Sequence, residues 1–280
     1  MFIDSHAHLF FKDFKDDLDD VIKRAQEAGV DYIVNPGTDL ETSRQSIELA
    51  ERFEMVYACV GFHPHDASKA DGKSLEEIEQ LSLHPKVVGI GEIGLDYHYN
   101  FSPPEKQREV FSQQIEIALR RNLPIVIHSR EAEDDTLRIV EEYAHQSRSA
   151  GSPPEQSPGV QPASRGPLRG VFHCFPGDAA MAQKVIGWGF YISIPGFVTF
   201  GSKPTRPNSM VEVASKIPAR HILLETDSPY LTPAPNRGKR NEPANIPFIA
   251  EKIAQLQGLT AAEIGRASSA GVRELFGIGK

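Results

Sequence analysis

The sequence predicts an α/β fold in which eight strands and their intervening helices close into a (β/α)8 barrel, the TIM barrel. Short apolar runs alternate with amphipathic segments along the whole chain, and 280 residues hold eight such units in a single domain, residues 1–280. An open, doubly wound sheet is the rival fold, and it usually carries a glycine-rich turn after its first strand. The segment DSHAHL (4–9) has no such turn.

Each expected strand is a short apolar run bounded by polar residues, glycine or proline. In chain order the strands are 2–5, 32–37, 55–61, 87–94, 124–129, 170–175, 190–194 and 221–227. Helical spacing of apolar residues is clearest at 13–29, 40–53 and 104–122. Segment 147–167 contains five prolines and no apolar period. We therefore expect it to be a solvated loop inserted on the barrel face opposite the active site.

Composition and charge narrow the class of protein. The chain is 40% hydrophobic and 24% charged, as in globular proteins that dissolve in water. Two cysteines are too few for a disulfide framework, and the longest apolar window, 187–200, is too short to span a membrane. We expect a cytoplasmic protein with no membrane segment and no obligate protein partner. The net charge of −8 argues against a wholly basic nucleic-acid-binding surface but allows a local basic patch or a bound divalent cation.

Imidazole and carboxylate side chains recur at the carboxyl ends of the expected strands, where a TIM barrel carries its active site. Six of the eight strands supply them, and the residues are His6, His8, His63, Glu92, His128, His173 and Asp227. A single histidine or carboxylate at such a place is more often a hydrogen-bonded structural residue or a helix cap. Seven at equivalent positions are not independent, so we interpret them as one site.

Metal binding is the physical explanation of this set. His6 and His8 are two residues apart on an extended segment, so both imidazoles can face one ion. Imidazole with carboxylate suits Zn²⁺, Mn²⁺ or Fe²⁺, and also Mg²⁺ where carboxylate and water dominate. Four histidines and two carboxylates exceed the needs of one tetrahedral ion, which favours two ions with Glu92 able to bridge them. Two ions indicate hydrolysis by an activated water, with Asp227 as its proton acceptor.

Two neighbours of these residues, Asp4 and Cys174, are not assigned as metal ligands. Asp4 could fix the tautomer of a ligating imidazole, or it could form a hydrogen bond at the strand end, and the sequence leaves both roles open. Cys174 directly follows His173. Because adjacent residues of a strand face opposite sides, we expect Cys174 to be a buried packing residue rather than a ligand.

The chain resembles the TatD family of metal-dependent hydrolases, within the amidohydrolase superfamily of distorted TIM barrels. The resemblance rests on seven segments in family order: DSHAHL (4–9), GFHPH (61–65), GEIGLDY (91–97), PIVIHSREA (124–132), FHCFPG (172–177), ETDSPYL (225–231) and RGKRNEP (237–243). It implies a two-metal site with Glu92 as the bridge and the ligands His6, His8, Glu92, His128, His173 and Asp227. The chain departs from the family in its long loop at 147–167 and at Gly271, where asparagine is usual.

Proteins similar to this chain are divalent-cation-dependent nucleases that trim DNA from the 3′ end and are typically cytoplasmic. The resemblance therefore implies a 3′–5′ exodeoxyribonuclease acting on single-stranded DNA, with His63 and Arg130 facing the substrate phosphate. A separate basic cluster, Arg237, Lys239 and Arg240, lies on the loop after the eighth strand. It is the densest in an acidic chain, so we expect it to contact an anionic substrate.

Two other functions remain open at this point. One is hydrolysis of an amide, an ester or a cyclic C–N bond in a small molecule, as in the wider superfamily. The other is a metal-binding scaffold without catalysis. The sequence favours phosphodiester hydrolysis because of the RGKRNEP segment (237–243). A non-catalytic scaffold would be expected to have lost some of the proposed ligands. All of them are present in this chain.

Overall fold

Eight parallel strands form the centre of the protein and pair in chain order from β1 to β8. The computed structural model describes residues 1–149, 166–201 and 209–279. The strands are β1 (Phe2–Asp4), β2 (Val30–Pro36), β3 (Val56–Val60), β4 (Val87–Asp96), β5 (Ile125–Arg130), β6 (Gly170–Phe172), β7 (Tyr191–Ile194) and β8 (Ile222–Leu224). The predicted TIM barrel and all eight predicted strands are confirmed. β6 and β8 each end three residues before the predicted end.

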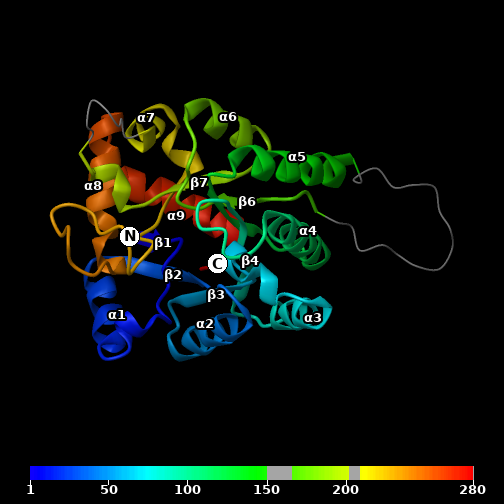
Figure 1. Cartoon of the computed structure of the whole chain (residues 1–280). Coiled ribbons are helices and arrows are strands. Elements are labelled where there is room, and N and C mark those ends of the chain that lie inside the picture. Colours follow the sequence, from blue (N-terminus) through cyan, green and yellow to red (C-terminus); the bar gives the residue numbers. More distant parts are fainter. Residues whose placement is uncertain (150–165, 202–208, 280) are drawn as a thin grey trace.

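Helices α1 to α8 lie around the strands in chain order, and α9 crosses behind them (Figure 1). Their bounds are α1 (Leu18–Glu27), α2 (Leu40–Arg52), α3 (Gly72–Leu81), α4 (Pro104–Arg121), α5 (Glu133–Ser149), α6 (Ala179–Gly187), α7 (Ser209–Lys216), α8 (Ile246–Gln257) and α9 (Ala261–Phe276). The helices predicted at 40–53 and 104–122 are confirmed. The helix predicted at 13–29 is shorter, because Lys12–Phe14 forms a separate 3₁₀ turn and α1 begins after Asp17.

Local sequence fixes where several helices begin and end. Three helices start with a capping box, in which two side chains three positions apart bond each other's backbone N–H: Asp39 with Thr42, Asp71 with Ser74, and Thr260 with Glu263. α4 ends at Asn122, whose left-handed φ of 52° closes the helix. These signals define the residues at which the helices begin and end.

The proline-rich segment predicted as a loop at 147–167 is described only at its ends. Residues 150–165 lie outside the described residues, so the conformation of this segment and the face it leaves from stay predictions. α5 reaches Ser149, so the helix extends three residues into the predicted loop. The buried Ser147 hydroxyl oxygen accepts a hydrogen bond from Leu168 N at 3.0 Å, which places the two ends of the segment side by side.

A buried apolar layer and helix α9 close one end of the barrel. The layer consists of Ile3, Val34, Cys59, Val88, Val126, Val171, Leu223, Val272, Leu275, Phe276 and Ile278. Gly271 lets α9 approach the strands, since a Cβ there would lie 2.8 Å from Tyr191 Cε1 and 2.9 Å from Leu223 Cδ2. Glycine at position 271 therefore permits close helix-to-strand packing. The candidate functional groups lie at the opposite end of the barrel, at the carboxyl ends of the strands.

β8 and β1 meet through a few backbone contacts and one buried carboxylate. Ser5 N donates to Leu224 O at 3.0 Å. Asp4 is fully buried and accepts hydrogen bonds from His6 N at 3.2 Å, Thr226 N at 2.9 Å and the Thr226 hydroxyl at 2.6 Å. Burial raises the pKa of Asp4 to about 8. Of the two roles considered for Asp4, the structure shows the strand-end hydrogen bond, which ties β1 to β8.

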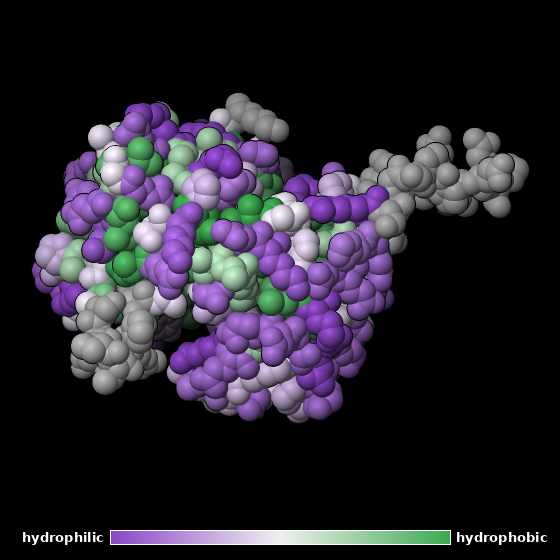
Figure 2. All heavy atoms as spheres, turned by 90° about the horizontal axis from the view of Figure 1, so that it is seen from above, coloured by the Kyte–Doolittle hydropathy of each residue, from purple (hydrophilic) through white to green (hydrophobic). Residues whose placement is uncertain are grey.

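The surface is polar over most of the face seen from above, with hydrophobic residues in small groups (Figure 2). Within the described part of the chain, no helix combines the length and the apolar character needed to cross a membrane. Three large apolar side chains with substantial exposure, Tyr99, Phe197 and Tyr230, line the cavity that holds the candidate site.

Gly271→Ala should lower the free energy of unfolding by about 1–3 kcal/mol, because the added methyl group overpacks against Tyr191 and Leu223. The matched control is Gly187→Ala in α6, where a Cβ meets no atom within 4 Å. There the better helix propensity of alanine should raise stability by up to about 1 kcal/mol. Urea unfolding followed by circular dichroism measures both variants, and equal effects would contradict the close packing of α9.

Candidate functional site

The predicted site residues converge at the carboxyl ends of the strands, around a cavity of about 740 Å³. The cavity lining includes His8, His63, Glu92, His128, Arg130, His173 and Asp227. Three overlapping groups of side chains have donor atoms within 4.8 Å of one another and could hold an ion: His6, His173 and Asp227; His6, His8 and Glu92; and His63, Glu92 and His128. All six predicted ligands occur in these groups.

Glu92 reaches the centre of the site because β4 is irregular beside it. β4 continues two residues past its predicted end at residue 94, to Asp96, and its pairing with β5 shifts register between Ile90 and Ile93. Such a bulge bends a strand and re-aims a side chain. The backbone N–H of Glu92 leaves the ladder and donates to Gly37 O at 2.9 Å.

The two carboxylate oxygens of Glu92 face two different groups of histidines. Oε2 lies 3.3 Å from His6 Nε2 and 3.5 Å from His8 Nε2. Oε1 lies 2.8 Å from His128 Nδ1 and 3.5 Å from His173 Nε2. Burial alone would raise the pKa of Glu92, but the surrounding histidines outweigh it and hold that pKa well below its ordinary value. One ionised carboxylate therefore stands between two sets of nitrogen donors.

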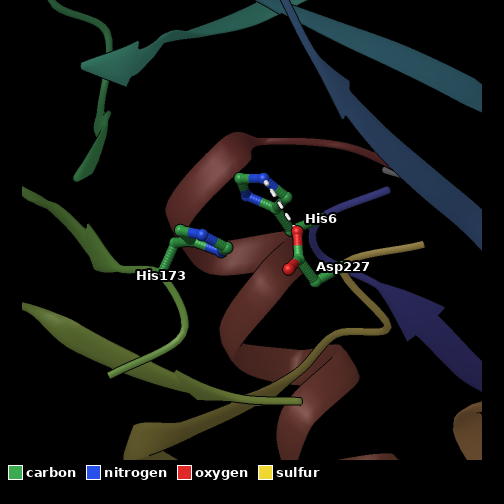
Figure 3. Close-up of side chains that lie close together, drawn as sticks. All are labelled: His6, His173 and Asp227. Carbon is green, nitrogen blue, oxygen red and sulfur yellow. Dashed lines mark ion pairs between the residues drawn. The ribbon is translucent and has the colours of Figure 1, made fainter. Parts of the chain in front are cut away.

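His6 and Asp227 meet across the β8–β1 seam, with His173 beside them (Figure 3). The Nε2 atoms of His6 and His8 lie 4.0 Å and 3.6 Å from Asp227 Oδ1. The His6 ring stacks on the His173 ring with centroids 3.8 Å apart. Asp227 has a left-handed φ of 55°, and its N–H donates to His6 O at 2.9 Å. The first and last strands thus bring these side chains to the same side of the barrel.

Hydrogen bonds at the outer nitrogens orient His8 and His173. His8 Nδ1 lies 3.3 Å from Pro36 O, and His173 Nδ1 lies 3.2 Å from Glu225 Oε2. An oxygen acceptor requires the proton on Nδ1, so in the neutral ring the lone pair is on Nε2 and faces the cavity. Both rings are therefore set to bind an ion through Nε2.

His128 and His63 are held through the opposite nitrogens. Asp96 Oδ2 lies 3.2 Å from His128 Nε2, and Glu92 Oε1 lies 2.8 Å from His128 Nδ1. Burial alone would lower the pKa of His128, but the two carboxylates outweigh it and raise that pKa, so both ring nitrogens can donate here. In the neutral ring the proton held by Asp96 leaves Nδ1 available to an ion. His63 Nδ1 accepts a hydrogen bond from His65 N at 3.1 Å, so in the neutral ring the proton is on Nε2. Burial lowers the pKa of His63 to about 4, which keeps the ring neutral. By this tautomer, His63 is a hydrogen-bond donor to the cavity rather than a metal ligand.

The donor set fits a divalent cation. The Nε2 atoms of His6 and His8 lie 3.1 Å apart, with carboxylate oxygens of Glu92 and Asp227 close to both. Burial lowers the pKa of His8 to about 3 and raises the pKa of Asp227 to about 7. Buried lone pairs and carboxylates that converge in this way repel one another unless a cation lies between them. Imidazole with carboxylate is the chemistry that Zn²⁺, Mn²⁺ and related ions accept.

Sequence reasoning missed two carboxylates that position these histidines, Glu225 and Asp96. Glu225 is fully buried, and it accepts hydrogen bonds from Cys174 N at 2.7 Å and the Ser193 hydroxyl at 2.6 Å in addition to facing His173. Glu225 precedes Asp227 by two residues, which is the spacing that drew attention to His6 and His8. Asp96 lies in the quoted segment GEIGLDY and ends β4. The sequence signals for Glu225 and Asp96 were therefore their places in the same segments as Asp227 and Glu92.

The expected burial of Cys174 as a packing residue is wrong. Cys174 is half-buried and lines the cavity. β6 ends at Phe172, and Cys174 has a left-handed φ of 42°, so the alternation of a regular strand no longer applies. Within the described residues, none of the candidate metal groups includes the Cys174 thiol.

The predicted substrate-binding cations differ in where they lie. Arg130 lines the cavity with His63, whereas Arg237, Lys239 and Arg240 are not among its lining residues. The Arg240 guanidinium pairs with both Asp17 carboxylate oxygens at 2.7 Å, which ties the loop to the start of α1 and accounts for this residue without a substrate. Substrate contact by Arg237, Lys239 and Arg240 stays a prediction.

Comparison with known proteins identifies the family of the chain. The family model described as TatD related DNase matches residues 3–277. The chain belongs to the TatD family. The resemblance seen in its seven sequence segments is therefore confirmed, and with it the class of metal-dependent hydrolases.

Individual relatives align with nearly the whole of this chain. It is 39% identical over 278 residues to an uncharacterized metal-dependent hydrolase, YabD, of Bacillus subtilis, covering 99% of this chain and 100% of the relative. It is 36% identical over 280 residues to the 3′-5′ ssDNA/RNA exonuclease TatD of Shigella flexneri, covering 98% of each. The crystal structure of YjjV, a TatD homologue from Escherichia coli K12, superposes with a TM-score of 0.85 at 28% identity, covering 99% of this chain and 98% of that one.

Glu225→Gln should weaken divalent-ion binding about 10–100-fold, because His173 loses the carboxylate that fixes its Nε2 lone pair toward the cavity. Isothermal titration calorimetry on chelator-treated protein measures the affinity, and circular dichroism checks the fold. Glu251→Gln, at an exposed position of α8, is the matched control and should leave the affinity unchanged. Unchanged affinity in Glu225→Gln would contradict the positioning role.

Proposed function

We propose that the protein is a metal-dependent 3′–5′ exonuclease that acts on single-stranded nucleic acid through two divalent ions. The observation that carries the proposal is the division of the two Glu92 oxygens, with Oε2 beside His6 and His8 and Oε1 beside His128 and His173. A carboxylate that faces two donor sets is suited to bridge a pair of ions. A relative at 36% identity that is named a 3′-5′ ssDNA/RNA exonuclease supports the substrate.

In this proposal the ligands divide around Glu92. His6, His8 and Asp227 would hold one ion, and His128 and His173 would hold the other. The imidazoles favour Mn²⁺ or Zn²⁺, and the carboxylates with water also admit Mg²⁺. When bound, such a pair lowers the pKa of a water molecule and stabilises the attacking and leaving oxygens of a phosphodiester.

The remaining steps belong to side chains of the chain itself. Asp227 accepts the proton of the attacking water, a role that suits a carboxylate beside the proposed ligands His6 and His8. His63 donates from Nε2 to a phosphate oxygen, in keeping with its tautomer. Arg130 supplies a positive charge from the cavity wall. Arg237 and Lys239 lie further along the loop after β8, where they would contact the strand outside the cavity.

The location of the protein and its organisation as one domain over residues 1–280 are also proposals. Both cysteines are free, which supports a reducing compartment such as the cytoplasm. The continuous pairing of β1 through β8 supports a single domain.

Product analysis tests the proposed function. Single-stranded DNA and RNA, labelled at either the 5′ or the 3′ end, are incubated with Mg²⁺, Mn²⁺ or Zn²⁺ and with chelator. We expect stepwise release of nucleotides from the 3′ end that stops when chelator is added. A panel of small amides, esters and cyclic amides is assayed in parallel. Hydrolysis of that panel without any cleavage of nucleic acid would replace the proposal by the small-molecule alternative.

Asp227→Asn should lower kcat on single-stranded DNA about 100- to 10,000-fold, because the water loses its proton acceptor. Elemental analysis of the purified variant shows whether an ion is lost together with the proton acceptor. Asp20→Asn, at an exposed position of α1, is the matched control and should keep full activity. Full nuclease activity in Asp227→Asn would mean that the site is assigned wrongly or that the activity is a contaminant.

A further inference from the structure

A pair of aromatic side chains stands beside the cavity, on the loop between β4 and α4. The rings of Tyr99 and Phe101 are stacked, with centroids 5.4 Å apart and planes within 5° of parallel. The two residues are 48% and 67% exposed. Single exposed apolar side chains are ordinary on protein surfaces, but packing of the core does not explain two stacked rings that are both exposed.

The aromatic pair is held by the carboxylate that also positions His128. Asp96 Oδ1 accepts a hydrogen bond from Tyr99 N at 3.0 Å, and Asp96 Oδ2 lies 3.0 Å from His65 Nε2. The His65 ring meets both aromatic rings edge-on, at centroid distances of 5.4 Å to Tyr99 and 4.9 Å to Phe101. Asp96 Oδ2 also lies 3.2 Å from His128 Nε2. The pair is therefore fixed in relation to the candidate metal ligands.

A positive charge adjoins the aromatic pair on its cavity side. The Arg130 guanidinium lies 4.8 Å from the centroid of the Tyr99 ring, and both side chains line the cavity. A flat ring surface next to a guanidinium matches the two parts of a nucleotide, which are a planar base and a phosphate. The cavity, with its candidate metal groups, lies at the end where the phosphate would be.

We propose that Tyr99 and Phe101 form a stacking platform for a nucleobase of the strand whose phosphate enters the cavity. The platform rests on the proposed nuclease function and adds a basis for strand selection. Bases in a duplex are already stacked on their neighbours, whereas an unpaired base is free to stack on protein rings. Every base has a π-face, so the platform favours single strands over duplexes without selecting a sequence.

Binding to two oligonucleotides tests the platform. One is an ordinary single strand, and the other has the same length and phosphates but abasic sugars throughout. Fluorescence anisotropy with Mn²⁺ and hydrolysis-resistant phosphorothioate versions of both strands reports binding without cleavage. Phe101→Leu keeps an apolar side chain but removes the flat ring, so it should weaken binding of the ordinary strand about 5- to 150-fold and leave the abasic strand unchanged. Phe101→Trp should restore binding, and Leu83→Ala, at a 53% exposed position between α3 and β4 that does not line the cavity, is the matched control.

Three binding results would overturn the platform: equal weakening of both strands by Phe101→Leu, weakening of neither, or no binding of either strand by the wild-type protein. Turnover with Mn²⁺, measured in parallel, separates this proposal from the nuclease function. Here Phe101→Leu should raise KM for the ordinary strand and leave kcat unchanged. Base-dependent binding with no cleavage of any nucleic acid would overturn the nuclease function and keep the platform. Cleavage of both strands with equal kcat/KM would overturn the platform and keep the nuclease function.

Discussion

Closure of the barrel between β8 and β1 is the constraint on which the site depends. His6 and His8 directly follow the first strand, and Asp227 follows the last, so they can share an ion only if the two strands are neighbours. The buried Asp4 carboxylate holds this seam by accepting from His6 N and from both the N–H and the hydroxyl of Thr226. A buried carboxyl group is costly unless it is hydrogen-bonded, and here each bond crosses or borders the seam.

The charge of the site is set by the carboxylates that surround its histidines. Glu92, Glu225 and Asp96 lie around histidines, two of which, His8 and His63, burial keeps neutral. Burial also lowers the pKa of His173 and His128, but the neighbouring carboxylates outweigh it and raise the pKa of His173 to about 10 and that of His128 above its ordinary value, so the site carries charges of both signs. Divalent ions add positive charge, so under the proposed function they favour substrate entry as well as chemistry. Arg130 and the His63 N–H then add attraction at the cavity wall.

The sequence was informative where a local pattern has one structural meaning. Eight apolar runs predicted eight strands, and strand-end polar residues predicted which side chains would meet, because parallel strands bring equivalent positions together. Its failures arose where the backbone departs from a regular element. Cys174 leaves strand alternation after β6 ends early, and β4 runs past its predicted end through a register shift beside Glu92. Phe14 is buried in a separate 3₁₀ turn, so the apolar spacing continued across a break that only a tertiary contact reveals. Arg240 could not be separated from Arg237 by charge alone, since its partner Asp17 is distant in sequence.

The apolar layer beneath the site joins the two ends of the chain. Ile3 from β1 packs in the same layer as Val272, Leu275 and Phe276 from α9. Protein synthesis runs from the N-terminus, so this layer cannot be completed until the last helix has left the ribosome. The histidines at positions 6 and 8 are thus synthesised well before α9, which completes the layer beneath them. A nascent chain that lacks α9 cannot yet hold these histidines in their final surroundings.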